Sequence, residues 1–360
     1  MTTLRIREAQ PKDYGAVRAC VADVFLETAS QKATSFGQSL WEWQYLAPER
    51  GSVVILAEDS GQVCGYYHAV LTPMLYQGES VLAALIQDVG ILRSHRRKGI
   101  FRSLGAFALD CFRSHGADFA YGFPNSRSMP SFVRNHNYSI LTKVPVYVAP
   151  LNLKTALGNR VWPSWLGWAL GSVVGSAYRS LRVRRCQVRP EERLVTLDAF
   201  DNTMLAATAR PLEEAVVTIH RTPDYLNWRF IDKPATHYVA SGLARNGEIQ
   251  AYLVTQRSVL FSTPCTLLMD FGCRDGGEDA WCELVGTHLV AERELGMALA
   301  VTMGLHPLLN RLRSLGFLRI PEKVNPRPFN LMVKDISSGA RSGIYDPDRW
   351  LITLADWDVF

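Results

Sequence analysis

The residues best suited to chemistry lie in a basic loop over residues 91–102, whose sequence is Ile-Leu-Arg-Ser-His-Arg-Arg-Lys-Gly-Ile-Phe-Arg. Its cationic side chains are Arg93, Arg96, Arg97, Lys98 and Arg102. An apolar run over Val81–Leu92 precedes the loop, and the apolar period of a helix follows it over Phe101–Arg113. Backbone N–H groups at a helix start lack partners within the helix and lie at the positive end of its dipole. With Gly99 allowing close approach, the loop predicts a phosphate or pyrophosphate site, and a solvated basic turn is the alternative.

Other reactive residue types do not fall into familiar catalytic or metal-binding spacings. The sequence has no G-x-x-x-x-G-K-[ST], G-x-G-x-x-G, H-E-x-x-H or G-x-S-x-G, so nucleotide hydrolysis, zinc proteolysis and a nucleophile elbow lack support. The 7 cysteines are scattered and never spaced C-x-x-C, which favours a reducing compartment over a disulfide framework. The histidines show no metal-ligand spacing, so no metal is expected.

The elements that must position the basic loop alternate in type. Over residues 4–148 the expected order is β-α-β-β-β-α-β-α-β, with a hairpin formed by Val53–Glu58 and Val63–Leu71 and a closing strand over Leu141–Val148. This order predicts an α/β fold with a mixed sheet, in which the basic loop joins a strand to the helix that follows it.

The second half of the chain repeats motifs of the first. The matching segments are 40–45 with 225–230, 53–71 with 238–255, Gln87–Gly90 with Met269–Gly272, and 133–138 with 312–317. Because these likenesses occur in the same order, they predict a duplicated fold, the alternative being chance similarity between two α/β domains.

A segment over 151–190 contains no acidic residue and concentrates basic ones, which are Lys154, Arg160, Arg179, Arg182, Arg184, Arg185 and Arg189. Its charge-free run, Val161–Tyr178, has tryptophans at one end and arginines beyond the other, as suits an interfacial helix on anionic lipid. A helix packed over a domain junction is the favoured interpretation, and peripheral membrane contact through 161–185 is the alternative. A nucleic-acid partner is not expected, because no nucleic-acid-binding motif supports one.

The composition is that of a globular chain, with 360 residues, 48% of them hydrophobic and 20% charged, enough for two or three domains. The net charge of +5 is concentrated in the 91–102 loop and the 151–190 segment, so the rest of the chain is mildly acidic. The first residues lack the apolar stretch of a secretory signal, so a cytoplasmic location is expected.

The loop in its setting resembles the GNAT superfamily of acyl-CoA-dependent N-acyltransferases, whose pyrophosphate loop reads [QR]-x-x-G-x-[GA] between the fourth strand and the third helix. Arg96 and Gly99 match this pattern, whereas Phe101 stands where the family has Gly or Ala. The element order also agrees, and Gly122–Ser126 looks like the G-[FW]-P-N turn of a GNAT subgroup that often acts on sugars or polysaccharide precursors. The C-terminal half resembles a second, degenerate GNAT domain, because Cys273–Asp279 carries acids where a phosphate needs cations.

The resemblance implies acyl transfer from acetyl-CoA or another acyl-CoA, used as a co-substrate, to an amine. The thioester carbonyl would lie in the splay between the fourth and fifth strands, polarised by a backbone N–H near Val89–Leu92, and the pyrophosphate would lie on the basic loop. The implied cofactor-binding residues are Val89, Gly90, Ile91, Leu92, Arg96, Arg97, Lys98, Gly99, Ile100, Phe101, Arg102 and Asn125.

The catalytic residues implied are Asp88, Asn125 and Tyr138. The family's usual basic Glu corresponds to Gln87, which cannot titrate, so the adjacent Asp88 is the candidate base; a structural brace is an equal alternative, since the repeat also has an Asp there. The family's usual acid, a Tyr, is replaced by Val133. Asn125 could instead orient the substrate, and Tyr138 or the nearby His136 could donate a proton.

The sequence therefore predicts two tandem GNAT-like acyltransferase domains: 1–150 binds acyl-CoA, 151–190 is a linker or inserted helix, 191–335 is degenerate, and 336–360 is a tail packed on the body. The favoured function is N-acylation, acetyl by default, of a small-molecule amine such as an amino sugar or a polysaccharide precursor. The alternatives are a non-catalytic acyl-CoA sensor or assembly factor, a protein N-acetyltransferase, and a Fem-like aminoacyl transferase.

Overall fold

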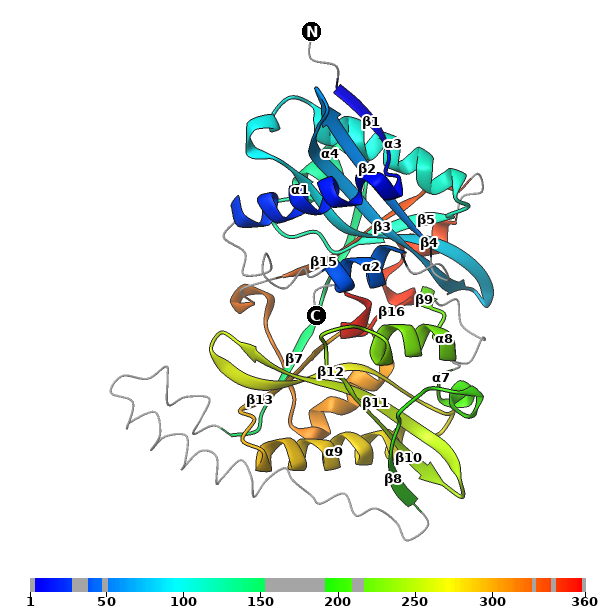
Figure 1. Cartoon of the computed structure of the whole chain (residues 1–360). Coiled ribbons are helices and arrows are strands. Elements are labelled where there is room, and N and C mark those ends of the chain that lie inside the picture. Colours follow the sequence, from blue (N-terminus) through cyan, green and yellow to red (C-terminus); the bar gives the residue numbers. More distant parts are fainter. Residues whose placement is uncertain are drawn as a thin grey trace, which may run out of the picture. The chain divides into compact units, whose positions relative to one another are not determined.

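The computed structural model describes residues 4–27, 38–46, 51–152, 192–208, 217–325, 328–337 and 341–357. The predicted membrane-contact segment 161–185 lies outside the described residues, as does nearly all of the predicted linker. The chain divides into two compact units (Figure 1). Unit 1 comprises Met1–Lys143, Ala215–His220 and Arg327–Trp350, and unit 2 comprises Val144–Glu214, Arg221–Pro326 and Leu351–Phe360.

Unit 1 is built on a mixed sheet with the order β1-β2-β3-β4-β5-β15-β6. The strands are β1 (Leu4–Glu8), β2 (Ser52–Asp59), β3 (Gln62–Tyr76), β4 (Glu79–Ile91), β5 (Phe119–Gly122), β15 (Phe329–Asp335) and β6 (Ser139–Val144), and β9 (Val217–Ile219) pairs with β3 and with β16 (Trp350–Leu351). β3 and β4 are antiparallel, whereas β4 and β5 are parallel. The sheet is therefore the mixed one that the sequence predicts.

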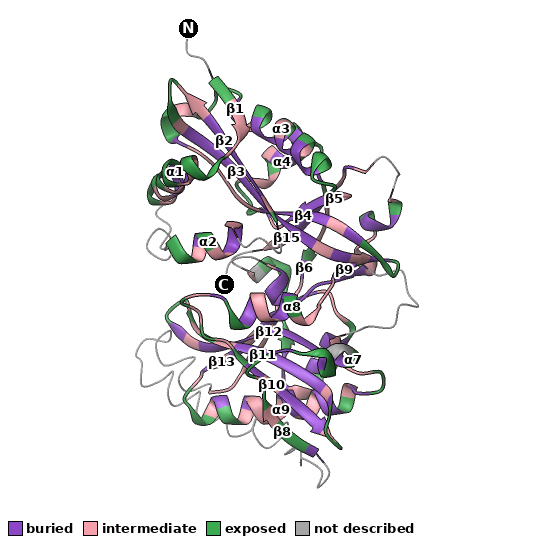
Figure 2. Cartoon of the chain, turned by 45° about the vertical axis from the view of Figure 1, so that its right-hand side comes forward, coloured by how far each residue is buried: buried purple, intermediate pink, exposed green. Residues whose placement is uncertain are grey.

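Helices cover the sheet of unit 1. They are α1 (Tyr14–Glu27), α2 (Gln38–Leu46), α3 (Ile100–Ser114) and α4 (Met129–His136). α3 buries Ile100, Leu104, Ala108 and Phe112, which recur every four residues and so form one stripe along the helix. In Figure 2, α1 and α3 lie on either side of β2 and β3, which are largely buried.

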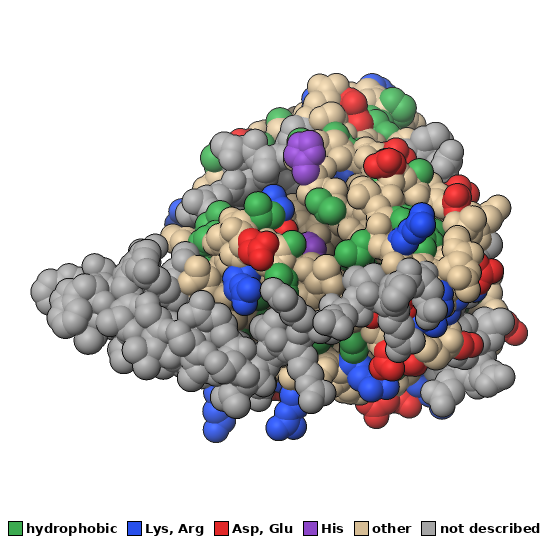
Figure 3. All heavy atoms as spheres, turned by 90° about the horizontal axis from the view of Figure 1, so that it is seen from below, with side chains coloured by type: hydrophobic (Ala, Val, Ile, Leu, Met, Phe, Trp, Pro, Cys, Tyr) green, Lys and Arg blue, Asp and Glu red, His purple; other side chains and the backbone are tan. Residues whose placement is uncertain are grey.

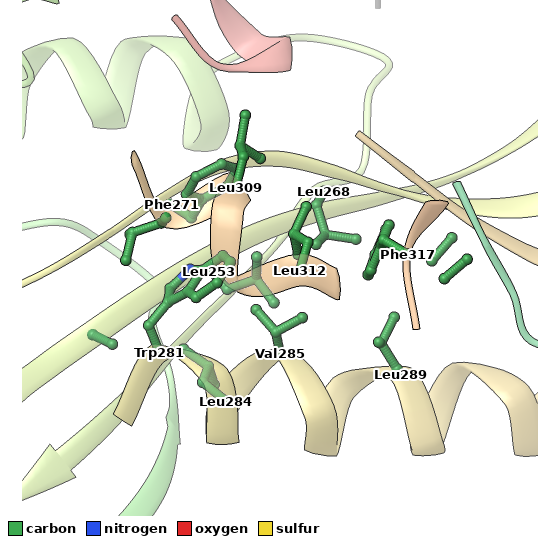
Figure 4. Close-up of a cluster of buried hydrophobic side chains, with 14 of the residues drawn as sticks. Leu253, Leu268, Phe271, Trp281, Leu284, Val285, Leu289, Leu309, Leu312 and Phe317 are labelled. Carbon is green, nitrogen blue, oxygen red and sulfur yellow. The ribbon is translucent and has the colours of Figure 1, made fainter. Parts of the chain in front are cut away.

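Unit 2 has its own sheet, with the order β14-β7-β13-β12-β11-β10-β8. The strands are β7 (Val146–Pro150), β8 (Glu192–Thr196), β10 (Val239–Arg245), β11 (Glu248–Leu260), β12 (Thr263–Cys273), β13 (Leu299–Met303) and β14 (Leu318–Arg319). Among its described residues the α-helices are α7 (Leu205–Thr208), α8 (Pro223–Leu226) and α9 (Glu278–Glu294). Trp281, Leu284 and Val285 of α9 pack against Leu253 and Phe271 of the sheet (Figure 4). This cluster is the core of unit 2.

The expected closing strand over Leu141–Val148 is wrong as a single element. It divides at Pro145 into β6 and β7, and β7 pairs with β13 in the sheet of unit 2. Proline has no N–H to donate to a strand ladder, which is a physical reason for the break. Conversely, β15 comes from the C-terminal half of the sequence but pairs with β5 in the sheet of unit 1. The domain boundaries expected at residues 150 and 335 divide the chain into consecutive stretches. Each sheet, in contrast, contains strands from both the N-terminal and the C-terminal half of the chain.

The two units repeat the same hairpin geometry. Tyr66 of β3 pairs with Gly90 of β4, and Tyr252 of β11 pairs with Gly272 of β12. Each hairpin also changes register next to this pair, between Tyr67 and Ala69 in unit 1 and between Val254 and Thr255 in unit 2. Because a bulge is a specific local irregularity, its recurrence beside matching residues supports a common fold for both units.

No helix among the described residues is long and apolar enough to cross a bilayer. On the face shown in Figure 3, basic and acidic side chains are interspersed with hydrophobic ones. The described residues of this face therefore carry charges of both signs.

Candidate functional site

The basic loop of unit 1 ends in an exposed helix start. After a short turn over Arg93–His95, Arg97 and Gly99 both take left-handed backbone conformations, with φ of 66° and 79°, and α3 begins at Ile100. A Cβ atom built on Gly99 would meet nothing within 4 Å, so the space beside this backbone is open. The loop thus presents exposed cationic side chains around the first N–H groups of α3.

Side-chain contacts hold this loop against the neighbouring strands. The Arg96 guanidinium donates through Nε to the Ile91 carbonyl at 3.0 Å. The His95 imidazole lies 3.2 Å from a carboxylate oxygen of Asp59, at the β2–β3 turn. Arg96 therefore helps to shape the loop as well as adding charge to it.

The strand before the loop diverges from its parallel neighbour. β4 and β5 pair from Ala83 with Phe119 to Ile86 with Gly122, where β5 ends. β4 runs on to Ile91 with β3 as its strand neighbour among the described residues. The predicted splay is therefore present beside Val89–Ile91, and an extended ligand could pair with β4 there.

A bulge at the end of β4 directs Asp88 toward α2. His68 of β3 lies opposite both Gln87 and Asp88, because the register changes between Tyr67 and Ala69. The Tyr45 hydroxyl of α2 donates to the Asp88 carboxylate at 2.8 Å. Tyr45 is a site residue that the sequence does not reveal, because residues 40–45 stand out only as a segment matched in the second half of the chain. Neither the bulge nor a contact between α2 and β4 leaves a local signal in the sequence.

The surroundings of Asp88 are aromatic. The ring of His68 lies 4.8 Å from that of Tyr45 and 5.1 Å from that of Tyr66. His68 is fully buried, and burial lowers its pKa to about 3, so its imidazole is neutral at pH 7. Burial, and to a lesser extent the Asp88 charge, raises the pKa of Tyr66. Neither His68 nor Tyr66 therefore gains or loses a proton near pH 7.

Tyr138 lies on the other face of the sheet. Tyr66 and Tyr67 are successive residues of β3, so they point to opposite faces. Tyr67 packs against Phe112 of α3 and Phe132 of α4, and Tyr138 also packs against Phe132. Tyr138 is buried, which raises its pKa. The structure thus does not bring Tyr138 together with Asp88.

Phe101 contacts α4. Its ring stacks on that of His136 at 4.6 Å, and the His136 imidazole is 3.0 Å from the Phe101 carbonyl through Nε2. Gly105 makes room for the His136 ring, since a Cβ atom on Gly105 would lie 2.0 Å from that ring. Burial is the main cause that lowers the pKa of His136. The bulky residue at the last position of the loop pattern is thus accommodated by packing.

Asn125 is part of the turn that leads into α4. Its side-chain oxygen accepts hydrogen bonds from the N–H groups of Arg127 at 2.9 Å and Ser128 at 3.0 Å. Its carbonyl accepts from the Met129 N–H at 3.0 Å. The Asn125 oxygen therefore shapes its own turn, as is common for Asn before a helix.

The corresponding loop of unit 2 has a different character. Arg274 donates to the Ile249 carbonyl at 2.9 Å and pairs with Glu248 at 2.7 Å. α9 starts with two acidic residues, Glu278 and Asp279, where an anion would be repelled. This loop therefore lacks the cationic, open character of its counterpart in unit 1.

Of the predicted site residues, the structure brings the basic loop, the end of β4 and Asp88 together in unit 1. Tyr138 lies apart from them, and the Asn125 oxygen is used in a turn. Among the residues that the structure describes, no group of three or more His, Cys, Asp or Glu side chains could hold a metal ion.

Comparison with known proteins gives a family for the N-terminal part of the chain. Residues 5–141 match the family model of the acetyltransferase (GNAT) domain. Comparison with curated proteins gave no significant match.

Solved structures resemble this chain over nearly its whole length. A GCN5-related N-acetyltransferase from Anabaena variabilis has a TM-score of 0.62 at 11% identity, over 93% of this chain and 73% of that one. A tandem GNAT protein from the clavulanic acid biosynthesis pathway has a TM-score of 0.56 at 12% identity, over 94% of this chain and 100% of that one. The N-myristoyltransferase of Saccharomyces cerevisiae, solved with bound myristoyl-CoA, has a TM-score of 0.58 at 10% identity, over 93% of this chain and 79% of that one. At such identities the likeness shows a shared fold.

Proposed function

The chain is a member of the GNAT superfamily, with its GNAT domain over residues 5–141, and on this premise we propose that it is an acyl-CoA-dependent N-acyltransferase whose acyl-CoA binds to unit 1. The observation that carries the proposal is the conjunction of an exposed cationic helix start with a strand edge that has lost its parallel neighbour. The first suits a pyrophosphate, and the second suits the extended pantetheine arm.

The residues present fit an acyl-CoA. The backbone over Arg96–Arg102 would hold the pyrophosphate, with open space beside Gly99 and charge from Arg97 and Lys98. The N–H and C=O groups of Val89–Ile91 that point away from β3 would pair with the pantetheine amides, and one N–H there would polarise the thioester carbonyl. Phe101 would leave this surface accessible, since its ring packs on His136.

Asp88 is the proposed base for the acceptor amine. Its carboxylate is half-buried, lies on β4 beside the proposed thioester site, and is oriented by the Tyr45 hydroxyl. The amine would transfer its proton to Asp88 directly or through water as it attacks the carbonyl, and the leaving thiolate would be reprotonated. The burial of Tyr138 on the opposite face weighs against its expected role as the proton donor.

The proposed acceptor is a small-molecule amine, and acetyl is the proposed acyl group. The Gly122–Asn125 turn supports an amino sugar or a polysaccharide precursor through its likeness to a GNAT subgroup. Peripheral membrane contact through 161–185 and a cytoplasmic location stay predictions from the sequence.

Binding and turnover can be tested separately. We expect the full chain to bind acetyl-CoA in calorimetry and to release free thiol from it when an amine panel that includes amino sugars is added. Gly99→Glu places a negative charge and a strained side chain in the loop, so it should weaken binding by at least roughly tenfold. Arg319→Glu, an exposed charge reversal in unit 2, is the matched control and should leave binding unchanged.

Two outcomes would redirect the proposal. Wild-type affinity in Gly99→Glu would remove the loop from the site. Tight acetyl-CoA binding without thiol release across the panel would favour the alternative of a non-catalytic acyl-CoA sensor, which the replacement of the family's usual Glu by Gln87 also favours.

A further inference from the structure

We infer that the segment Leu351–Asp356 fills the strand splay of unit 2, in the position that corresponds to the acyl-CoA position of unit 1, so that each chain binds a single acyl-CoA. The identity of the ligand in unit 1 rests on the proposed function. The occupation of unit 2 rests on contacts within that unit alone.

The two splays correspond strand by strand. In unit 2, β12 and β13 pair in parallel from Cys265 with Leu299 to Leu267 with Val301, as β4 and β5 do in unit 1. Beyond these pairs β12 carries Asp270 and Gly272, as β4 carries Asp88 and Gly90. The diverging ends of β12 and β13 are therefore the counterpart of the proposed thioester site.

The C-terminal segment lies in this divergence. Leu305 and Ile352 exchange two backbone hydrogen bonds, of 2.9 and 2.8 Å. The N–H of the preceding residue, Gly304, donates to the Pro145 carbonyl, on the side of β13 where β7 lies. Because successive N–H groups of a strand point to opposite sides, the Leu305 hydrogen bonds lie on the β12 side. The contact at Gly304 is so close that a Cβ atom there would lie 2.2 Å from the Ile352 oxygen. An extended peptide thus takes the place of an extended ligand.

A buried polar network fixes the segment to β12. The Thr353 hydroxyl donates to Asp270 at 2.7 Å, and the Thr353 N–H donates to Asp356 at 2.8 Å. Arg221 contacts both carboxylates at 2.9 Å. Asp270 is 0% exposed and also accepts from the Tyr252 hydroxyl at 3.0 Å. Releasing the segment would take the Asp356 carboxylate away from Arg221 and the Thr353 hydroxyl away from Asp270, and losing such hydrogen bonds at a buried ion pair is costly.

This network explains why the two matching aspartates differ. Asp88 is half-buried and accepts a hydrogen bond from the Tyr45 hydroxyl of α2, whereas Asp270 is fully buried and bonded to Thr353 and Arg221. Both the segment and the acidic start of α9 oppose the binding of acyl-CoA to unit 2. The segment fills the strand edge, and the acidic helix start repels a pyrophosphate. Unit 2 is therefore closed to acyl-CoA by its own chain.

The first test is the stoichiometry of acetyl-CoA binding to the full chain by calorimetry. One equivalent should bind, and Gly99→Glu should remove that binding. Two equivalents would overturn the inference of a single site, whereas one equivalent that persists in Gly99→Glu at wild-type strength would remove the basic loop from that site.

The second test is hydrogen exchange of the Leu305 and Ile352 amides, which needs no ligand. Both should exchange slowly with or without acetyl-CoA. Thr353→Val removes the hydroxyl that Asp270 accepts and should speed their exchange by about tenfold, whereas Thr196→Val, at an exposed position of β8, should not. Exchange as fast as in exposed loops would overturn the inference whatever unit 1 binds. Slow exchange in a protein that fails to bind acetyl-CoA would instead refute the proposed function and leave the occupied splay standing.

Discussion

Asp88 and Tyr45 meet because a bulge in β4 turns the Asp88 side chain toward α2. A hydroxyl that donates to a carboxylate limits its rotation and so fixes the direction from which a proton is accepted. The counterpart in unit 2, Asp270, is held by Arg221 and Thr353 and is fully buried. The same aspartate position therefore has two different environments, since Asp88 is half-buried beside the end of β4 in unit 1 and Asp270 is fully buried in an ionic network in unit 2.

Asp88→Asn keeps the size of the side chain but removes its ability to accept the amine proton. We expect thiol release to fall by at least roughly 100-fold, while acetyl-CoA affinity changes by less than about twofold. Tyr45→Phe removes only the orienting hydrogen bond and should cost roughly tenfold in turnover. Thiol release and calorimetry measure the two effects. Wild-type turnover in Asp88→Asn would give Asp88 the structural role of Asp270.

His68 makes stability depend on pH. Its pKa is about 3 in the folded protein, against an ordinary value of 6.5, so the unfolded chain binds the additional proton. The stabilisation from the neutral form is fully present above pH 6.5 and is lost as the pH falls from there toward 3. We expect the free energy of unfolding to drop by about 2 kcal/mol more between pH 7 and pH 5 in the wild type than in His68→Phe. Urea unfolding at the two pH values measures this, and equal drops in both proteins would contradict it.

At the scale of the elements, local pattern was sufficient for some features and insufficient for others. The apolar stripe of α3 and the hairpin of β2 with β3 are encoded by residues near one another in sequence, and both are where the pattern predicts them. The division of β6 from β7 falls at Pro145, which lacks the N–H that a continuous strand would need there. The contact of Tyr45 with Asp88 spans 43 residues, and no periodicity encodes such a contact.

The β3–β4 hairpin requires glycine at position 90. A Cβ there would lie 2.4 Å from the Tyr66 hydroxyl oxygen, and Tyr66 is buried and cannot move aside easily. Gly90→Ala should therefore lower the free energy of unfolding by about 2 kcal/mol and weaken acetyl-CoA binding through displacement of β4. Gly15→Ala is the control, because a Cβ on this α1 residue meets nothing within 4 Å and alanine favours a helix. Equal stability of the two variants would show that Tyr66 can adjust.

At the scale of the whole molecule, the match of residues 5–141 to a GNAT domain does not mean that this stretch is complete in itself. The sheet of unit 1 takes β15 from near the C-terminal end, where Met332 and Val333 pair with Gly122 and Tyr121. Arg341 also pairs with Asp118 at 2.9 Å. Pairing between segments more than 200 residues apart has no local sequence signal, which is why the sequence analysis placed 1–150 and 191–335 in separate domains.

This exchange predicts the behaviour of a fragment that ends at residue 150. Without β15, the buried strand β5 would become a sheet edge with exposed N–H and C=O groups, and β7 would have no sheet to join. We expect the fragment to aggregate or to unfold without cooperativity, and to bind acetyl-CoA at least roughly tenfold more weakly than the full chain. A chain that ends at residue 357 keeps both exchanged strands, so it should retain cooperative unfolding and full affinity. Circular dichroism melts and calorimetry on the two proteins make the comparison. A monomeric 1–150 fragment with cooperative unfolding and wild-type affinity would show that the exchanged strand is dispensable and that the GNAT domain folds from its own sequence alone.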